Sequence, residues 1–286
     1  MIELKKLEVW FVAGSQKLYG NDALNEIEKN ANEVASSINA SMQIPVNICF
    51  KGVLTTTEEI TKICQAASHN EQCIGLICWM HTFSPGKMWI NGLKILKKPL
   101  LHLHTQFNQD IPWESIDMDY MNIHQSAHGG REFGFVCSRL NIHRKVVVGH
   151  WADQEVQKKI GIWTRAACGY KEMQSLRIAR FGDNMRDVAV TEGDKVDAQI
   201  RFGFEVHGYG LGDLVECVDQ ATEEDINNLI EQYLNLYDIA SELRPEGSRH
   251  KELKDAAAIE GGLRTFLNEG NFSAFTDTFE NLKGLK

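Results

Sequence analysis

Three side chains near the middle of the chain have the spacing of a metal site. His124, His128 and Glu132 recur every fourth residue, which would place two imidazoles and a carboxylate on one face of a helix. The glycine pair at 129–130 argues against that helix, because each glycine costs a helix interior about 0.5–1 kcal/mol relative to alanine. We therefore expect the helix to begin near Ala127, with His124 in the preceding loop. This favours a binding loop at a helix start over a metal site.

Two apolar runs end in side chains that could bind a sugar. Residues 74–80 and the run that begins at Leu100 are each expected to form a buried strand, joined by a short helix at 88–96. This connection makes the strands parallel, and ligands of open parallel sheets lie beyond the carboxyl ends of the strands. Those ends carry hydroxyl, amide, imidazole and aromatic groups, namely His81, Thr82, Phe83, Ser84, Thr105, Gln106 and Asn108. With no phosphate-binding glycines among them, they favour a neutral polyhydroxyl ligand.

The loop after the first expected strand offers a second set of polar groups. Gly14 and Gly20 flank this loop, but a dinucleotide motif needs three glycines at fixed spacing. Its other residues include Ser15, Gln16 and Tyr19, which again suit hydroxyl groups. The alternative is a solvated turn that uses its glycines for positive φ.

The remaining candidates have structural interpretations. His102 and His104 share a strand face, and a satisfied structural pair is favoured over a ligand pair. Asp117 and Asp119 are expected to form turns. Three charged residues near Asn184 could form ion pairs whose only role is to fix the conformation of a loop: Arg180, Asp183 and Arg186. Trp79, Trp89 and Trp113 could be sugar platforms, but core or interface positions explain them equally well.

The order of expected elements predicts two α/β domains. Five expected strands, beginning near residues 8, 46, 74, 100 and 145, alternate with helices over 1–175. This alternation is typical of a doubly wound, flavodoxin- or Rossmann-like domain with a parallel sheet. A second α/β domain, 176–286, has expected strands at 176–181, 204–209 and 272–279. Because no helix follows the last of these, we expect this domain to be incomplete. A long irregular segment at 108–125 indicates a functional loop or an interface.

Composition excludes several classes of protein. The chain has 286 residues, 43% of them hydrophobic, and a net charge of -9, which argues against nucleic-acid or anionic-membrane binding. Charges near the amino terminus argue against a signal peptide, and no apolar run is long enough to span a bilayer. Seven cysteines without a Cys-x-x-Cys pair indicate reduced thiols. We therefore expect a cytoplasmic protein.

Several long strings of the sequence resemble one family over the whole chain. The densest are Trp79-Met80-His81-Thr82-Phe83-Ser84-Pro85, His104-Thr105-Gln106-Phe107-Asn108, Ala127-His128-Gly129-Gly130-Arg131-Glu132-Phe133-Gly134 and Arg180-Phe181-Gly182-Asp183-Asn184-Met185-Arg186. In these strings the chain resembles the L-arabinose isomerases, bacterial enzymes that interconvert L-arabinose and L-ribulose. The resemblance implies an N-terminal doubly wound domain and a similar central domain, followed in the family by a β-rich C-terminal domain.

The resemblance also implies a site and a cofactor. Family residues that contact the polyol correspond to Gln16, Leu18, Phe83, Met185 and Phe279. Gln125 and His128 correspond to positions that a neighbouring subunit contributes, so the resemblance implies a homo-oligomer, a trimer or hexamer in the family. The family's divalent metal, usually Mn²⁺, polarises the oxygens at C1 and C2 of the sugar.

No residue of this chain corresponds to the family's metal ligands, which are two glutamates and two histidines. We therefore expect no catalytic residue and no metal within this chain, and no isomerase activity from it alone. One alternative is a sugar-binding or regulatory module of the same fold that lacks catalysis. Another is a related aldose isomerase, such as one for L-fucose. The segment 108–125 and the histidine-glycine segment after it are expected to pack against another subunit.

Overall fold

The computed structural model describes residues 3–285. The chain forms two compact units, Met1–Lys171 and Glu172–Lys286. The first unit thus ends within the last turns of helix α6 (Gln154–Met173). None of the helices among residues 3–285 has the length and apolar character needed to cross a membrane.

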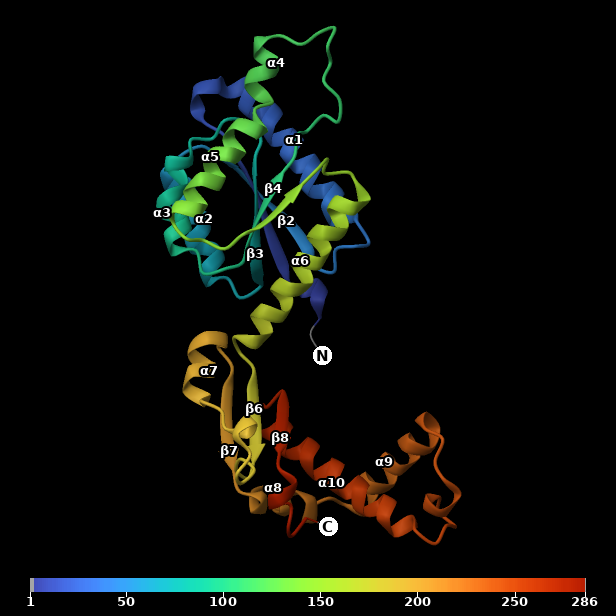
Figure 1. Cartoon of the computed structure of the whole chain (residues 1–286). Helices are drawn as coiled ribbons and strands as arrows, with labels where there is room; N and C mark the ends of the chain where they lie inside the picture. The colour runs from blue at the N-terminus through green and yellow to red at the C-terminus, as the bar shows by residue number, and fades with distance from the viewer. Residues whose placement is uncertain (1–2, 286) are drawn as a thin grey trace. The chain divides into compact units, whose positions relative to one another are not determined.

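A five-stranded parallel sheet forms the centre of the first unit (Figure 1). Its strands, in spatial order, are β2 (Asn47–Leu54), β1 (Glu8–Gly14), β3 (Cys73–Met80), β4 (Leu100–His104) and β5 (Lys145–Val148). All eight residues of β3 are buried, which explains its uninterrupted apolar sequence, because a central parallel strand is covered on both faces. The order is that of the flavodoxin-like doubly wound fold. The predicted fold class is confirmed.

Helices cover both faces of this sheet. On one face, α1 (Gly20–Ala40) and α6 pack on Val9, Phe11 and Ile77. On the other face, Trp10, Val12 and Leu76 contact residues of three helices: α2 (Thr57–His69), α3 (Ile90–Ile95) and α5 (Ser126–Arg139). Short 3₁₀ turns lie at η1 (Leu4–Lys6), η2 (Lys17–Tyr19) and η3 (Gly86–Trp89).

The segment predicted to be irregular contains a helix, α4 (Met118–Ile123). Asp117 caps it by accepting a hydrogen bond from the Tyr120 amide, with 2.8 Å between Oδ1 and N. The expectation of an entirely irregular segment over 108–125 was therefore wrong, because a local aspartate cap stabilises a short helix within it.

Helix α5 begins at Ser126, one residue before the predicted start, and contains the glycine pair at 129–130. Both glycines are buried. A Cβ atom added to Gly129 would lie 2.4 Å from the carbonyl oxygen of Thr82. A Cβ atom added to Gly130 would lie 2.5 Å from Nδ1 of His104. The pair therefore lets α5 pack directly against the ends of β3 and β4, and this packing outweighs the low helix propensity of glycine.

The second unit contains a three-stranded parallel sheet. Its spatial order is β7 (Glu205–Tyr209), β6 (Arg177–Phe181) and β8 (Ala274–Asp277). Ala179 and Phe181 of β6 pack in one core with three helices, α8 (Leu211–Asp219), α9 (Glu223–Leu236) and α10 (His250–Glu269). The unit also contains α7 (Lys195–Phe202) and the 3₁₀ turns η4 (Ala189–Thr191), η5 (Ser241–Leu243) and η6 (Phe279–Asn281). The last strand is shorter than predicted, so Phe279 begins η6 instead of ending β8.

Candidate functional site

The topological switch point of the first sheet lies between β1 and β3, where the strand order reverses. The loop after β1 carries Gln16 and Leu18, and the loop after β3 carries Phe83. The two loops are joined by a buried hydrogen bond from the Thr82 hydroxyl to the Ser15 hydroxyl, 2.9 Å long. The structure therefore brings these predicted residues to the edge of the sheet where ligands of doubly wound proteins bind.

Phe83 stacks on His128, with 4.3 Å between the ring centroids and 21° between the ring planes. His128 Nδ1 lies 3.3 Å from Oε1 of Gln125, the residue that precedes α5. Gly129 closely approaches Thr82. Because Phe83 follows Thr82 and His128 precedes Gly129, this approach brings the two rings together. Phe83, Gln125 and His128 thus form one group within one chain.

Gln16 and Leu18 differ from this group in their surroundings. Gln16 is partly buried and has extended backbone angles, φ -148° and ψ 150°. Leu18, within η2, has 83% of its surface exposed. It is an apolar side chain with nothing covering it in the described part of the first unit.

Four residues expected to face a ligand are instead buried in the loop ends: His81, Thr82, Ser84 and Thr105. The Asn30 amide and the ring of His81 lie 3.1 Å apart, and His81 stacks on Trp79 at 4.4 Å. Burial lowers the pKa of His81 to about 4, so the ring is neutral at pH 7. Ser84 accepts a hydrogen bond from the Trp89 indole. These groups make internal contacts that fix the positions of the loops.

The His124–His128–Glu132 spacing does not make a metal site. His124 ends α4 and lies outside α5, and the carboxylate of Glu132 accepts a hydrogen bond from the Gly86 amide at 2.8 Å. Among residues 3–285, no group of three or more histidine, cysteine, aspartate or glutamate side chains could hold a metal ion. The described residues therefore do not fit the divalent metal that the resemblance implies.

The sequence favours His102 and His104 as a structural pair whose ring nitrogens are hydrogen-bonded. For His102 this prediction is wrong. The two rings meet edge to face at 5.4 Å, and His102 also meets the ring of Phe133 at 5.0 Å. His102 is buried, and neither of its ring nitrogens has a hydrogen-bond partner in the described structure. Burial lowers its pKa to about 3. His102 is a core residue that the sequence pattern could not distinguish from a hydrogen-bonded one.

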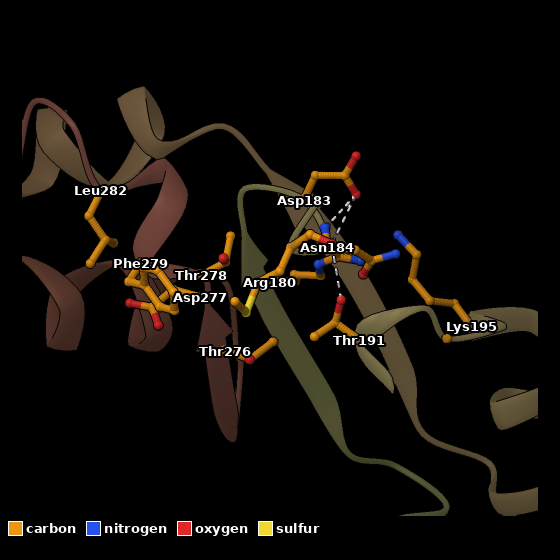
Figure 2. A pocket seen from close by; sticks show the side chains of 12 residues that line it. Arg180, Asp183, Asn184, Thr191, Lys195, Thr276, Asp277, Thr278, Phe279 and Leu282 are labelled. Carbon is orange, nitrogen blue, oxygen red and sulfur yellow. Dashed lines mark hydrogen bonds and ion pairs between the residues drawn. The ribbon is translucent and has the colours of Figure 1, made fainter. Parts of the chain in front are cut away.

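A cavity of about 470 Å³ lies at the carboxyl ends of β6 and β8 in the second unit (Figure 2). Met185, from the loop after β6, and Phe279, the first residue of η6, both line it. Strand order reverses between β6 and β8, so this cavity also occupies a switch point. Its other lining residues are Arg180, Asp183, Asn184, Thr191, Gly193, Lys195, Thr276, Asp277, Thr278 and Leu282.

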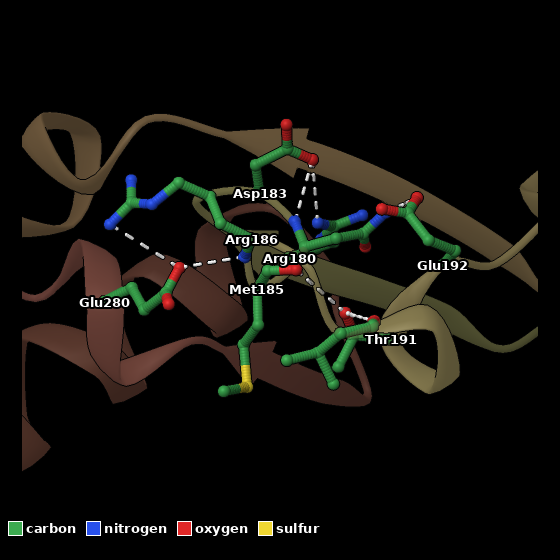
Figure 3. A network of polar contacts seen from close by, with 9 residues as sticks. Arg180, Asp183, Met185, Arg186, Thr191, Glu192 and Glu280 are labelled. Atoms are coloured by element: carbon green, nitrogen blue, oxygen red, sulfur yellow. Dashed lines mark hydrogen bonds and ion pairs between the residues drawn. The ribbon is translucent and has the colours of Figure 1, made fainter.

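Hydrogen bonds order the loop that carries Met185 (Figure 3). The carboxylate of Asp183 accepts a hydrogen bond from the Arg180 guanidinium at 3.0 Å and another from the backbone amide of Asn184 at 2.8 Å. The second of these bonds is the main reason that the pKa of Asp183 is lowered. The expected ion pair of Arg180 and Asp183 is confirmed, whereas Arg186 pairs with Glu280. Sequence reasoning missed Glu280, because no local pattern links positions 94 residues apart.

The fold and these two loop clusters define an α/β protein with two parallel sheets, the first of them doubly wound, and with polar and aromatic loops at the switch point of each sheet. Residues 3–175 match the model of the L-arabinose isomerase N-terminal domain, and residues 177–286 match that of the L-arabinose isomerase central domain. The chain belongs to the L-arabinose isomerase family.

Curated relatives with the name L-arabinose isomerase match the chain along its length. The relative from Geobacillus stearothermophilus is 54% identical over 286 residues, which is 100% of this chain and 58% of the relative. The relative from Koribacter versatilis is 54% identical over 285 residues, covering 57% of that protein. The relative from Yersinia pseudotuberculosis is 52% identical over 282 residues, covering 56%. The chain therefore spans somewhat more than half the length of the relatives it matches.

Proposed function

We propose that this chain supplies sugar-contacting loops of an L-arabinose isomerase, the enzyme that interconverts L-arabinose and L-ribulose. The observation that carries the proposal is the group of Phe83, Gln125 and His128, together with the cavity between Met185 and Phe279. Both lie at switch points, where doubly wound proteins bind ligands. An apolar wall that orients a sugar beside a few polar groups is the usual construction of such a site.

The chemistry of these side chains suits a neutral aldose. The Gln16 and Gln125 amides and the His128 imidazole can each donate or accept a hydrogen bond to a sugar hydroxyl. Leu18, Phe83, Met185 and Phe279 offer apolar surface to the carbon face of the sugar. Polar groups that bind a particular hydroxyl reject analogues that lack it, which would give the site its substrate preference.

We further propose that these 286 residues do not carry out the isomerisation alone, and that the family's Mn²⁺ is held by residues outside them. This is supported by the absence of a metal-binding group among residues 3–285 and by the 58% share of the Geobacillus stearothermophilus relative that the chain spans.

A turnover assay tests this proposal. The purified 286-residue chain is incubated with L-arabinose, with and without Mn²⁺, and L-ribulose is measured. We expect no product above the protein-free control. Adding the remaining part of the Geobacillus stearothermophilus relative should produce Mn²⁺-dependent conversion. Conversion by the chain alone would contradict the inactivity, and no conversion by the mixture would count against the enzyme.

A second candidate, a sugar-binding or regulatory module without catalysis, is favoured by the same absence of metal ligands in the described part of the chain. Tight, metal-independent binding of L-arabinose, with no activity restored in the mixture, would favour this module over the enzyme.

Association and location complete the proposal. Four apolar side chains of the segment 108–125 are exposed, which supports a homo-oligomer: Ile111, Trp113, Met118 and Met121. A cytoplasmic location is supported by Cys64, Cys78 and Cys137, which are buried together in one hydrophobic cluster. The net charge of -9 supports a protein that binds neither nucleic acid nor anionic membranes.

A further inference from the structure

The edge strand β5 has one covered face and one uncovered face. Val147 is buried in the same core as residues of α6, whereas Val146 is 42% exposed and Val148 is 62% exposed. Val146 pairs with His102, and paired residues of neighbouring strands point to the same face of a sheet, as does Val148 two residues further on. His102 meets the ring of Phe133 in α5. Helix α5 therefore covers β4 on this face but leaves the side chains of β5 exposed.

The side of α5 that faces the solvent carries two arginines next to this strand. Arg131, Phe135 and Arg139 recur every fourth residue, so they form one ridge of the helix, and all three are exposed. The Arg139 guanidinium lies 5.9 Å from the centre of the Phe135 ring. Gly134, beside Phe135, approaches Arg144, which directly precedes β5. We call the ridge and the uncovered strand residues the α5–β5 face: Arg131, Phe135, Arg139, Val146 and Val148.

The segment 108–125 of the same unit has the opposite charge. It contains no lysine or arginine, and Asp110, Glu114 and Asp119 are exposed. It includes α4 and the loop before it (Figure 1). Its four exposed apolar side chains, named above, resemble the valines and the phenylalanine of the α5–β5 face in being open to solvent.

The charges of both surfaces are unmatched within the chain. Among the described residues, no ion pair includes Arg131 or Arg139, and none includes Asp110, Glu114 or Asp119. The two surfaces are therefore complementary to each other in charge, and each has apolar side chains that a partner could cover.

We propose that the α5–β5 face binds the segment 108–125 of a second copy of this chain. Either surface placed against itself would bring like charges together, which opposes association. Placed against each other, the two surfaces bring arginines to carboxylates and cover apolar groups on both sides. Because the surfaces differ, each copy contacts one neighbour through each of them, as in a closed ring. The inference rests on the proposed homo-oligomer, for which it names the surfaces that meet.

The test measures the molar mass of the 286-residue chain by size-exclusion chromatography with light scattering, over a series of protein concentrations. One variant, Arg131→Glu/Arg139→Glu, makes both surfaces acidic. The other, Asp110→Arg/Glu114→Arg/Asp119→Arg, makes both surfaces basic. For each we expect the concentration at which half of the protein is assembled to rise about 10- to 100-fold. Combining all five substitutions makes the surfaces opposite in charge again and should restore the assembly.

The control is Lys29→Glu/Lys159→Glu, which changes the net charge by as much as the arginine variant does. Both lysines are exposed, and they lie in α1 and α6. This variant should assemble as the wild type does. Melting temperatures of all variants report whether they are folded.

Recovery in the combined variant separates contact between the two surfaces from a loss of folding. If the variants of one surface assemble like the wild type, the pairing of these surfaces is refuted and the proposed homo-oligomer stands. The same holds if the combined variant stays dissociated while it melts at the temperature of the wild type, or if the control dissociates too. If the wild type is a monomer at every concentration, the proposed homo-oligomer fails and the pairing fails with it.

Discussion

The carboxylate of Glu280 accepts a hydrogen bond from the backbone amide of Arg186, with 3.0 Å between Oε2 and N (Figure 3). The guanidinium of Arg186 lies 3.6 Å from the same oxygen. Met185 and Phe279 immediately precede these two residues and line one cavity. A single side chain therefore fixes the loop after β6 to η6 and sets the separation of two predicted sugar contacts.

Replacing Glu280 tests this link. We expect Glu280→Ala to lower the free energy of unfolding of the second unit by about 1–2 kcal/mol, because a hydrogen bond to a charged group is lost from a side chain that is 21% exposed. Glu280→Gln keeps an acceptor and should lose less. Urea unfolding measures the change. Glu246→Ala, at an exposed glutamate of the same unit, is the control and should change stability by less than about 0.5 kcal/mol. Equal effects of Glu280→Ala and the control would contradict the link.

Gly129 allows Phe83 to meet His128. We expect Gly129→Ala to destabilise the first unit by about 1–3 kcal/mol, because its Cβ would lie 2.4 Å from the carbonyl oxygen of Thr82. The Phe83–His128 stack should loosen, which nuclear Overhauser contacts between the two rings would report. Gly169→Ala is the matched control.

Gly169 lies in helix α6, and a Cβ atom added to it would meet nothing within 4 Å. Helix propensity therefore predicts a gain of about 0.5–1 kcal/mol for this control. If both substitutions lower the free energy of unfolding by similar amounts, the close contact of α5 with Thr82 is not the reason for glycine at position 129.

His102 carries a buried imidazole without partners in the described structure. We expect His102→Leu to raise the free energy of unfolding by about 1 kcal/mol at pH 7.5, because the unsatisfied ring nitrogens are removed from the core. His143→Leu, at an exposed histidine, should change stability by less than about 0.5 kcal/mol. A clear loss of stability in His102→Leu would mean that its ring nitrogens are satisfied after all.

Acid should unfold the first unit through its histidines. The folded-state pKa is about 4 for His81 and about 3 for His102, whereas an unfolded histidine titrates near 6.5. Below pH 6.5 the unfolded chain binds protons that the folded chain does not, so stability falls as the pH falls. Between pH 6.5 and about 4.5 each of these two histidines should lower the free energy of unfolding by about 1.4 kcal/mol for each unit that the pH falls. Burial also lowers the pKa values of His104 and His124, which act in the same direction.

The same pH series on His102→Leu provides the internal check. Between about pH 6.5 and 4.5 the free energy of unfolding of this variant should fall less steeply than that of the wild type. The two slopes should differ by about 1.4 kcal/mol per pH unit. Identical slopes in the variant and the wild type would refute a neutral, buried His102.

The alternation of strands and helices could be predicted, because buried parallel strands read as continuous apolar runs and helices begin at recognisable caps. The capping box at the start of α2, formed by Thr56 and Glu59, is one such cap. The glycine pair at 129–130 correctly predicted that His124 lies outside the helix, but the packing role of the pair depends on a contact with Thr82, far away in the sequence. Similarly, no local pattern could place Phe279 in a 3₁₀ turn instead of a strand.

The candidate site was predictable only in part. The loops after β1 and β3 follow from strand order, since carboxyl ends of parallel strands share one edge. The Phe83–His128 stack and the Arg186–Glu280 link required the folded chain. The spacing of His124, His128 and Glu132 suggested a shared helical face, but His124 ends a separate short helix that Asp117 caps.

Sugar binding by these loops is tested most directly by a nuclear magnetic resonance titration of the wild-type chain with L-arabinose in the absence of added metal. We expect saturable shifts at the His128 imidazole, the Phe83 ring, and the Met185 methyl group, with exposed control residues such as Met42 unchanged. Shifts confined to other surfaces, or none at any sugar concentration, would contradict the assignment of these loops to the sugar.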